Sequence, residues 1–335
     1  MTNGAQMNVL DNNTIPPSHA RERIMSFELM RVAAFLLVVA LHTIPADGPL
    51  SRSLNVFARL SAPFFFSLSG FFLGQTDEQR LRGRFLATAR ICLVCTVLYL
   101  VTALTGLTPP GEITPHTLKA FLLWNDFSPA FPLWYLFALL YVYGFFAVLV
   151  RLGGGERHFL GVALGLWLAR LFLTELDPIT SPQSIVFRSW LFTGVPMFGL
   201  GMLLNRKRPR LEKASPAAGA LVVCAGFLLA CLECRLRGVQ ELYVGTVVSL
   251  VGVYALCLNA PMKGLGRIKA LRGRNVGRAI LCAYVVHYAV MMAVPFPSPI
   301  GGFVITALLS LLIGVAFAVA ANWLSALCDT PHSRV

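Results

Sequence analysis

Residues 27–45 read FELMRVAAFLLVVALHTIP, an apolar stretch long enough to cross a lipid bilayer as one helix. It contains two ionisable side chains, Arg31 near its start and His42 near its end, eleven positions apart. At a rise of about 1.5 Å per residue this separation is roughly 16 Å, close to three helical turns. The two side chains are therefore predicted to project from nearly the same face of one membrane helix.

The composition of the whole chain fits the same environment. Hydrophobic residues make up 56% of the sequence and charged residues 13%, with a mean hydropathy of +0.70, whereas soluble domains carry about 25% charged residues. We therefore expect an all-α, polytopic integral membrane protein with about ten transmembrane helices. The apolar runs lie at approximately 25–45, 54–74, 85–106, 130–150, 158–174, 186–204, 216–233, 241–259, 278–295 and 300–325.

Two segments follow from this pattern. Residues 1–22 form a polar tail without the continuous apolar region of a signal peptide, so we expect a cytoplasmic tail. Residues 23–335 form one transmembrane domain, because the loops between the apolar runs are mostly too short to fold alone.

The distribution of Lys and Arg predicts the orientation. With the N-terminus inside, nineteen of these residues fall in the tails and loops on the cytoplasmic side and six in the loops on the opposite side, so both termini are expected in the cytoplasm. The formal charge of +13 is then a consequence of topology and gives no argument for a nucleic-acid partner. Such a chain is expected to be a multi-pass membrane protein.

Neither the cysteines nor the common catalytic motifs indicate a function. Two pairs with C-x-x-C spacing, Cys92/Cys95 and Cys231/Cys234, lie in apolar runs and lack further ligands nearby, so we predict buried thiols and no metal site. No serine-hydrolase elbow, zincin motif or phosphate-binding loop occurs.

Ionisable groups at membrane depth usually mark a pathway or a reactive site, which favours a function for Arg31 and His42. The alternative is that Arg31 pairs with Glu28 or extends back to the cytoplasm and that His42 is merely interfacial. Arg90 and Arg170, within other apolar runs, are expected to extend toward the membrane surface.

The second apolar run, A-P-F-F-F-S-L-S-G-F-F-L at 62–73, places Ser69 and Gly70 among phenylalanines, a composition that permits close helix approach. Together with the Arg-to-His spacing of the first run, it resembles the acyltransferase 3 family of integral membrane acyltransferases. Weaker similarities follow at F-P-L-W-Y-L (131–136), F-T-G-V-P-M-F-G-L-G-M-L-L (192–204) and A-Y-V-V-H-Y (283–288). The family's basic R-x-x-R in the first inner loop is here Q-R-L-R-G-R, residues 79–84.

The resemblance implies a multi-pass O-acyltransferase of the bacterial inner (cytoplasmic) membrane, with O-acetyl transfer expected. It would move an acyl group from cytoplasmic acyl-CoA to a hydroxyl of a cell-envelope carbohydrate or its lipid-linked precursor. It needs no permanently bound cofactor, since acetyl-CoA or another acyl-CoA is a substrate. His42 is then the general base or acyl carrier, and Arg31, with Arg82 and Arg84 from the inner loop, binds the donor.

Supporting roles remain open between structure and function. Glu28 and Ser69 lie beside the main candidates; Trp134 and Tyr135 fit an interfacial aromatic belt or a sugar-stacking platform; His287 fits core packing or catalysis. Acidic residues expected on the outer side, Asp126, Glu175 and Asp177, fit solvated loop ends or acceptor contacts.

A function of another class is also considered. The first two apolar runs are similar to the membrane portion of membrane-bound serine racemases, which is associated with serine uptake. The alternative is thus an amino-acid (serine-like) transporter or an acceptor-binding module on the same scaffold.

Overall fold

The computed structural model describes residues 17–73, 78–176, 185–259, 273–296 and 298–328. These residues are helical with short connections, and no strand occurs among them. The α-helices are α1 (Pro17–Thr43), α2 (Pro49–Ala58), α3 (Ser61–Phe71), α4 (Glu78–Leu104), α5 (Pro115–Trp124), α6 (Trp134–Arg151), α7 (Glu156–Leu176), α8 (Ile185–Arg188), α9 (Val195–Arg206), α10 (Arg208–Leu211), α11 (Pro216–Arg237), α12 (Val244–Asn259), α13 (Gly273–Ala293) and α14 (Pro299–Cys328). A 3₁₀ helix, Ser128–Leu133, precedes α6, and a π-helical turn, Trp190–Gly194, precedes α9.

Seven helical segments of this part of the chain are long and apolar enough to cross a membrane. They include α1 from Met25, α4, α7, α11, α13 and α14, together with the continuous stretch Pro115–Arg151 that contains α5 and α6. The all-helical, polytopic membrane architecture predicted from the sequence is therefore confirmed.

The three other predicted spans are shorter or interrupted helices. The run 54–74 is divided between α2 and α3, the run 186–204 is α8, the π-helical turn and α9, and the run 241–259 contains α12. Within the predicted polar tail 1–22, residues 1–16 lie outside the described residues, and α1 already begins at Pro17.

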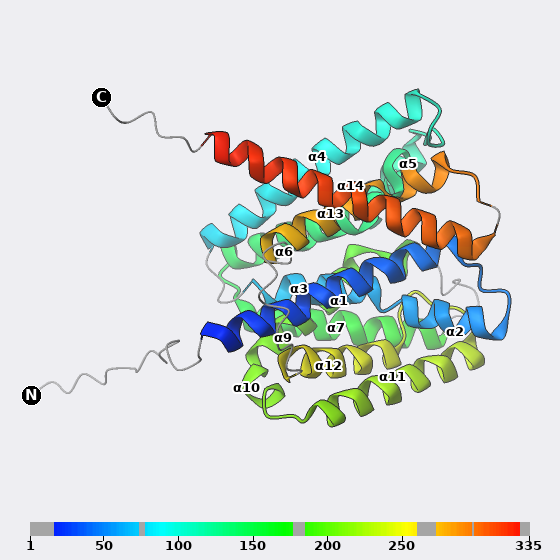
Figure 1. The fold of residues 1–335 in the computed structure, drawn as a ribbon. Coiled ribbons are helices and arrows are strands. Elements are labelled where there is room, and N and C mark those ends of the chain that lie inside the picture. Colours follow the sequence, from blue (N-terminus) through cyan, green and yellow to red (C-terminus); the bar gives the residue numbers. More distant parts are fainter. Residues whose placement is uncertain (1–16, 74–77, 177–184, 260–272, 297, 329–335) are drawn as a thin grey trace, which may run out of the picture.

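Helix α1 runs through the middle of the bundle and contacts α2, α3, α12, α13 and α14 (Figure 1). The most extensive pairings elsewhere are α11 with α12, α13 with α14, and α3 with α9. The start of α1, the start of α4, α10 and the end of α14 lie at one end of the bundle, and α2 and α5 lie at the other (Figure 1). We call the first of these the basic end, because Arg84, Arg206 and Arg208 belong to it, and the second the opposite end.

Glycine allows α3 and α9 to approach each other closely. A Cβ atom at Gly70 would collide with the carbonyl oxygen of Phe198, and one at Gly201 would collide with that of Ser67. The side chain of Asn205 also donates a hydrogen bond to the carbonyl of Phe71. The close helix approach predicted from the Ser/Gly run is confirmed, and it fixes the position of the α3 face that carries Ser69.

Candidate functional site

A cavity of about 270 Å³ lies toward the basic end, between α1, α3, α4, α6 and α13. Two arginines face it, Arg31 from α1 and Arg84 from the start of α4. The polar part of its wall is formed by Ser69, Tyr135, Tyr143 and Tyr284, and the apolar part by Phe65, Leu68, Phe72, Gly277, Ile280 and Leu281. Two cations and four hydroxyl groups therefore converge on one space inside a membrane domain.

Arg31 is held in place at the edge of this cavity. Its Nη1 donates a hydrogen bond to the carboxylate of Glu28 one turn earlier, and its guanidinium lies 5.9 Å from the ring centroid of Phe72. The Glu28 side chain is buried, and its second oxygen, Oε2, has no hydrogen-bond partner among the described residues. The ion pair with Glu28 and the place in the cavity wall are compatible, so the pairing does not remove Arg31 from the site.

Ser69 and Tyr135 form the wall where α3 meets α6. The Ser69 hydroxyl bonds to the carbonyl of Phe65 at 2.9 Å and lies 3.5 Å from the hydroxyl of Tyr135. The Tyr135 ring contacts the Phe66 ring at a centroid distance of 4.7 Å. These contacts fix the orientation of the Tyr135 hydroxyl, and the same residue leads onward to α13.

A chain of rings connects the cavity to His42. The centroid distances are 5.9 Å from Tyr135 to Tyr284, 5.6 Å from Tyr284 to His287, and 5.3 Å from His287 to His42. The Tyr284 hydroxyl donates a hydrogen bond of 2.6 Å to the carbonyl of Pro132, which fixes its ring. A contiguous series of polar aromatic groups thus leads from the arginine-lined cavity to the far end of α1.

Both candidates on α1 face the same partner helix. Arg31 lies beside Gly277, near the start of α13, and His42 lies beside His287, further along it. The prediction that Arg31 and His42 share one helix face is therefore confirmed.

The two histidines are in different environments. His287 is 1% exposed, and its Nδ1 bonds the carbonyl of Tyr284, which makes Nδ1 the donor and leaves Nε2 unprotonated. That Nε2 is buried with no hydrogen-bond partner among the described residues. His42, in contrast, keeps an exposed side chain. His42 is therefore accessible to a substrate, whereas His287 lies behind it.

A second, smaller pocket of about 50 Å³ lies at the opposite end, beside His42. Its wall includes Leu41, the residue before His42, together with Arg59 and Arg188, whereas His42 itself is not among the lining residues. The other lining residues are Ser61, Ala62, Pro63, Trp134, Thr193 and Glu241. We call this the outer pocket.

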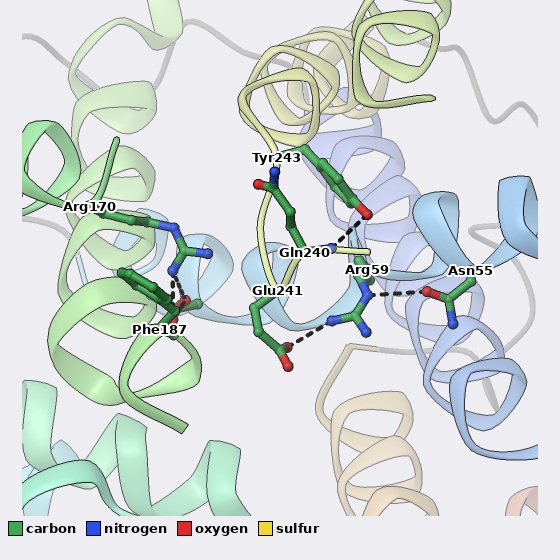
Figure 2. Close-up of polar contacts among 8 residues, drawn as sticks. Asn55, Arg59, Arg170, Phe187, Gln240, Glu241 and Tyr243 are labelled. Atoms are coloured by element: carbon green, nitrogen blue, oxygen red, sulfur yellow. Dashed lines mark hydrogen bonds and ion pairs between the residues drawn. The ribbon is translucent and has the colours of Figure 1, made fainter. Parts of the chain in front are cut away.

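Ion pairs and ring contacts hold the two arginines of the outer pocket. Arg59 follows α2 and contacts Asn55 at 3.2 Å and Glu241 at 2.8 Å, from α2 and the loop before α12 (Figure 2). Arg188, at the end of α8, lies 3.5 Å from Asp126 and 5.5 Å from the ring centroid of Trp134. Each guanidinium therefore has a carboxylate partner.

Asn125 joins the elements that form this pocket. It ends α5 in the left-handed backbone region at φ 56°, which asparagine tolerates better than most residues. Its side chain accepts a hydrogen bond of 2.6 Å from the backbone N–H of Trp190 and donates one of 3.1 Å to the carbonyl of Trp134. One residue thereby fixes both the start of α6 and the π-helical turn.

Arg170, on α7, connects α8 to the π-helical turn near the outer pocket. Only 3% exposed, it donates hydrogen bonds to the carbonyl of Phe187 at 2.6 Å and to the Thr193 hydroxyl at 3.3 Å, with its guanidinium over the Phe187 ring (Figure 2). The prediction that Arg170 extends to the membrane surface is wrong, because carbonyl and hydroxyl acceptors within the bundle satisfy its donors. Arg90, on α4, is exposed.

Five of the predicted site residues line one of the two spaces, whereas His42 and His287 are among the lining residues of neither. Arg31, Arg84, Ser69 and Tyr135 line the cavity, with Glu28 paired to Arg31, whereas Trp134 lines the outer pocket. Arg82 is exposed and lies outside the cavity wall. The side chains of Glu175 and Asp177 lie outside the described residues.

Several residues of the two spaces were not predicted as site residues. In the cavity they are Tyr143 and Tyr284, and in the outer pocket Arg59, Ser61, Arg188 and Glu241. Tyr284 had a usable signal, since it lies one helical turn before His287 in the A-Y-V-V-H-Y stretch. The charged residues of the outer pocket come from short connections without a recognisable pattern.

Comparison with known families decides the class of protein. A family model described as an acyltransferase domain (acyltransferase 3) matches residues 24–327, nearly the whole chain. The chain belongs to the acyltransferase 3 family. The resemblance inferred from the Arg31–His42 spacing and the Ser/Gly run is thereby confirmed. Neither the curated proteins nor the solved structures searched contain a match to this chain.

Membership of the acyltransferase 3 family makes the protein an enzyme, a membrane acyltransferase that needs an acyl donor and an acceptor. The family match thus favours the enzyme over the transporter considered as an alternative. Since the match extends from α1 to α14, the arginine-lined cavity and the His42–His287 pair both lie within the acyltransferase domain.

Proposed function

We propose that this membrane acyltransferase takes an acyl group from cytoplasmic acyl-CoA and transfers it to a hydroxyl group of a cell-envelope carbohydrate or its lipid-linked precursor in a bacterial inner membrane. Acetyl is the acyl group expected. The observation that carries the proposal is the ring series Tyr135–Tyr284–His287–His42, which joins the arginine-lined cavity to an accessible histidine.

The positive charge of the cavity wall indicates where acyl-CoA, the acyl donor, would bind. Coenzyme A carries phosphate groups, and guanidinium groups bind phosphate through paired N–H donors. Arg31 and Arg84 supply such donors in the cavity wall, at the basic end, which the charge rule assigns to the cytoplasm. The pantetheine arm then extends along the cavity, past Tyr135 and Tyr284, and brings the thioester toward His42.

The position and exposure of the two histidines indicate where acyl transfer would take place. His42 accepts the proton of the acceptor hydroxyl as its oxygen attacks the thioester carbonyl carbon. The new C–O bond forms, the C–S bond breaks, and the proton passes from His42 to the departing thiolate, so that the products are the ester and free coenzyme A. Buried His287 packs against His42 and limits the positions its ring can adopt.

The test uses the purified full-length chain in detergent with [¹⁴C]acetyl-CoA and a lipid-linked oligosaccharide fraction. We expect label on the oligosaccharide and loss of that label with hydroxylamine, which cleaves esters. His42→Gln keeps hydrogen-bonding capacity but cannot act as the base, and loss of a positioned base costs about 10²–10⁴-fold in rate. Acyl transfer by His42→Gln at near wild-type rate would contradict the role given to His42.

Donor binding gives the matched control. His42→Gln should bind acetyl-CoA within a few-fold of wild type, because His42 is not among the residues that line the cavity. If wild-type protein neither binds nor consumes acetyl-CoA, the acyl-CoA donor is wrong.

A further inference from the structure

The outer pocket adjoins the proposed catalytic histidine on the side away from the donor cavity. Leu41, Arg59 and Arg188 lie in its wall, and Leu41 directly precedes His42 in the last turn of α1. Trp134 lines the outer pocket while the next residue, Tyr135, lines the donor cavity, so the start of α6 separates the two spaces. A second substrate that enters from the opposite end would therefore meet His42 without passing the donor.

One buried hydroxyl group in the wall of the outer pocket has no hydrogen-bond partner among the described residues. Ser61, the first residue of α3, is 1% exposed, and its Oγ has no hydrogen-bond partner among the described residues. A buried hydroxyl without a partner carries a free-energy cost, because its hydrogen bonds to water are lost and not replaced. A hydroxyl group of a bound acceptor would remove this cost, since it both donates and accepts.

The charges of the pocket are already compensated. Arg59 is paired with Glu241 at 2.8 Å, and Arg188 with Asp126 at 3.5 Å, with all four side chains largely shielded from solvent. An anionic acceptor would have to displace a carboxylate or lie against it, and a cationic one would lie against two guanidinium groups. Such charge arrangements discriminate between partners by repulsion.

The small volume of the outer pocket limits the size of the group that can bind in it. A water-sized group needs about 10–15 Å³ of such space, so a pocket of about 50 Å³ admits a few non-hydrogen atoms and excludes a complete sugar ring. The acceptor therefore presents one hydroxyl-bearing edge to His42 and keeps the rest of its structure outside.

We propose that the outer pocket is the acceptor site and that it selects an uncharged, polyhydroxylated acceptor, with the Arg59–Glu241 ion pair excluding anionic ones. This inference rests on the proposed function, because it assumes that His42 transfers the acyl group.

The test compares two probes with the purified full-length chain and [¹⁴C]acetyl-CoA. Methyl β-D-glucopyranoside is neutral, and methyl β-D-glucopyranosiduronate has a carboxylate in place of the hydroxymethyl group. We expect label on the glucoside at a rate at least ten times that on the glucuronoside. In Glu241→Gln, Arg59 loses its carboxylate partner, so this ratio should fall severalfold; a ratio set merely by the missing hydroxyl would not change.

Asp47→Asn is the matched control. Asp47 is an exposed carboxylate shortly after α1 that lies outside the outer pocket, so its removal should leave the ratio unchanged. Three results would overturn the inference: a glucuronoside labelled as fast as the glucoside, a ratio unaffected by Glu241→Gln, or release of free coenzyme A with no label on either probe. Absence of both coenzyme A release and acetyl-CoA binding would instead overturn the proposed function.

A second measurement does not depend on turnover or on the folding of Glu241→Gln. Ala62→Cys, at a half-buried lining position next to Ser61 and in a chain whose other cysteines are replaced, is treated with a small methanethiosulfonate reagent. Millimolar glucoside should slow the modification severalfold, and the same concentration of glucuronoside should not. Equal rates with and without glucoside would show that the pocket does not bind this class of acceptor.

Discussion

The imidazole rings of His42 and His287 lie 5.3 Å apart between centroids, one from α1 and the other from α13. One ring is exposed and the other is 1% exposed, with its Nε2 unpartnered among the described residues. An unsatisfied buried nitrogen is unfavourable for stability, so its presence next to an accessible histidine favours a role in positioning or polarising His42.

His287→Phe tests this relationship. The substitution replaces the buried imidazole with an apolar ring. It removes the unpartnered Nε2, whose burial costs about 1–3 kcal/mol, and also the hydrogen bond from Nδ1 to the Tyr284 carbonyl, which contributes about 0.5–1.5 kcal/mol. We expect the melting temperature in detergent to stay the same or rise, while kcat for acyl transfer falls by at least tenfold and KM for acetyl-CoA changes little. A variant that loses activity and stability together would indicate a purely structural role.

Arg84 and Arg82 form a matched pair two residues apart on α4. Both side chains are exposed, but Arg84 lines the cavity and Arg82 lies outside its wall. Arg84→Ala should weaken acetyl-CoA binding by about tenfold, because loss of a charged hydrogen bond costs about 1.5–3 kcal/mol. Arg82→Ala should leave binding within twofold. Calorimetric titration of both variants measures the difference, and equal losses would contradict the donor cavity.

Arg31 is tested in the same titration. Arg31→Lys should restore part of the affinity lost in Arg31→Ala, since an ammonium group keeps the charge but lacks the planar pair of donors. Equal affinity in wild type and Arg31→Ala would exclude Arg31 from donor binding.

Arg170 and Arg90 compare a bonded and an exposed arginine in membrane helices. Arg170→Met removes the hydrogen bonds to Phe187 and Thr193, and we expect a loss of about 1–3 kcal/mol in stability together with reduced acyl transfer. Arg90→Met should stay within about 0.5 kcal/mol, as exposed substitutions usually do. Thermal unfolding in one detergent checks both, and a stable Arg170→Met would disprove the support assigned to Arg170.

Topology is tested by cysteine labelling from outside intact cells, in a background without other cysteines. Arg208→Cys, at the basic end, should be protected from an impermeant reagent, and Lys119→Cys, on α5 at the opposite end, should react. Reaction at Arg208→Cys with protection at Lys119→Cys would invert the orientation and, with it, the side of donor entry.

Properties of single helices could be predicted from the sequence alone. Hydropathy identified the long apolar helices of the described residues, although three further predicted spans are shorter or interrupted helices. Helical periodicity placed Arg31 and His42 on one face, and the Ser/Gly run predicted the close approach of α3 to α9. These are local properties: the rise and turn of a helix are fixed by its backbone, and the cost of exposing polar groups to lipid fixes its length.

The tertiary structure decided which side chains meet. His42 contacts His287 because α1 packs against α13, and Arg59 contacts Glu241 because the break after α2 faces the loop before α12. The location of Arg170 was predicted wrongly from the sequence, because its hydrogen-bond acceptors belong to α8 and the π-helical turn. Such contacts depend on the packing of both partner segments, and neither segment alone contains that information.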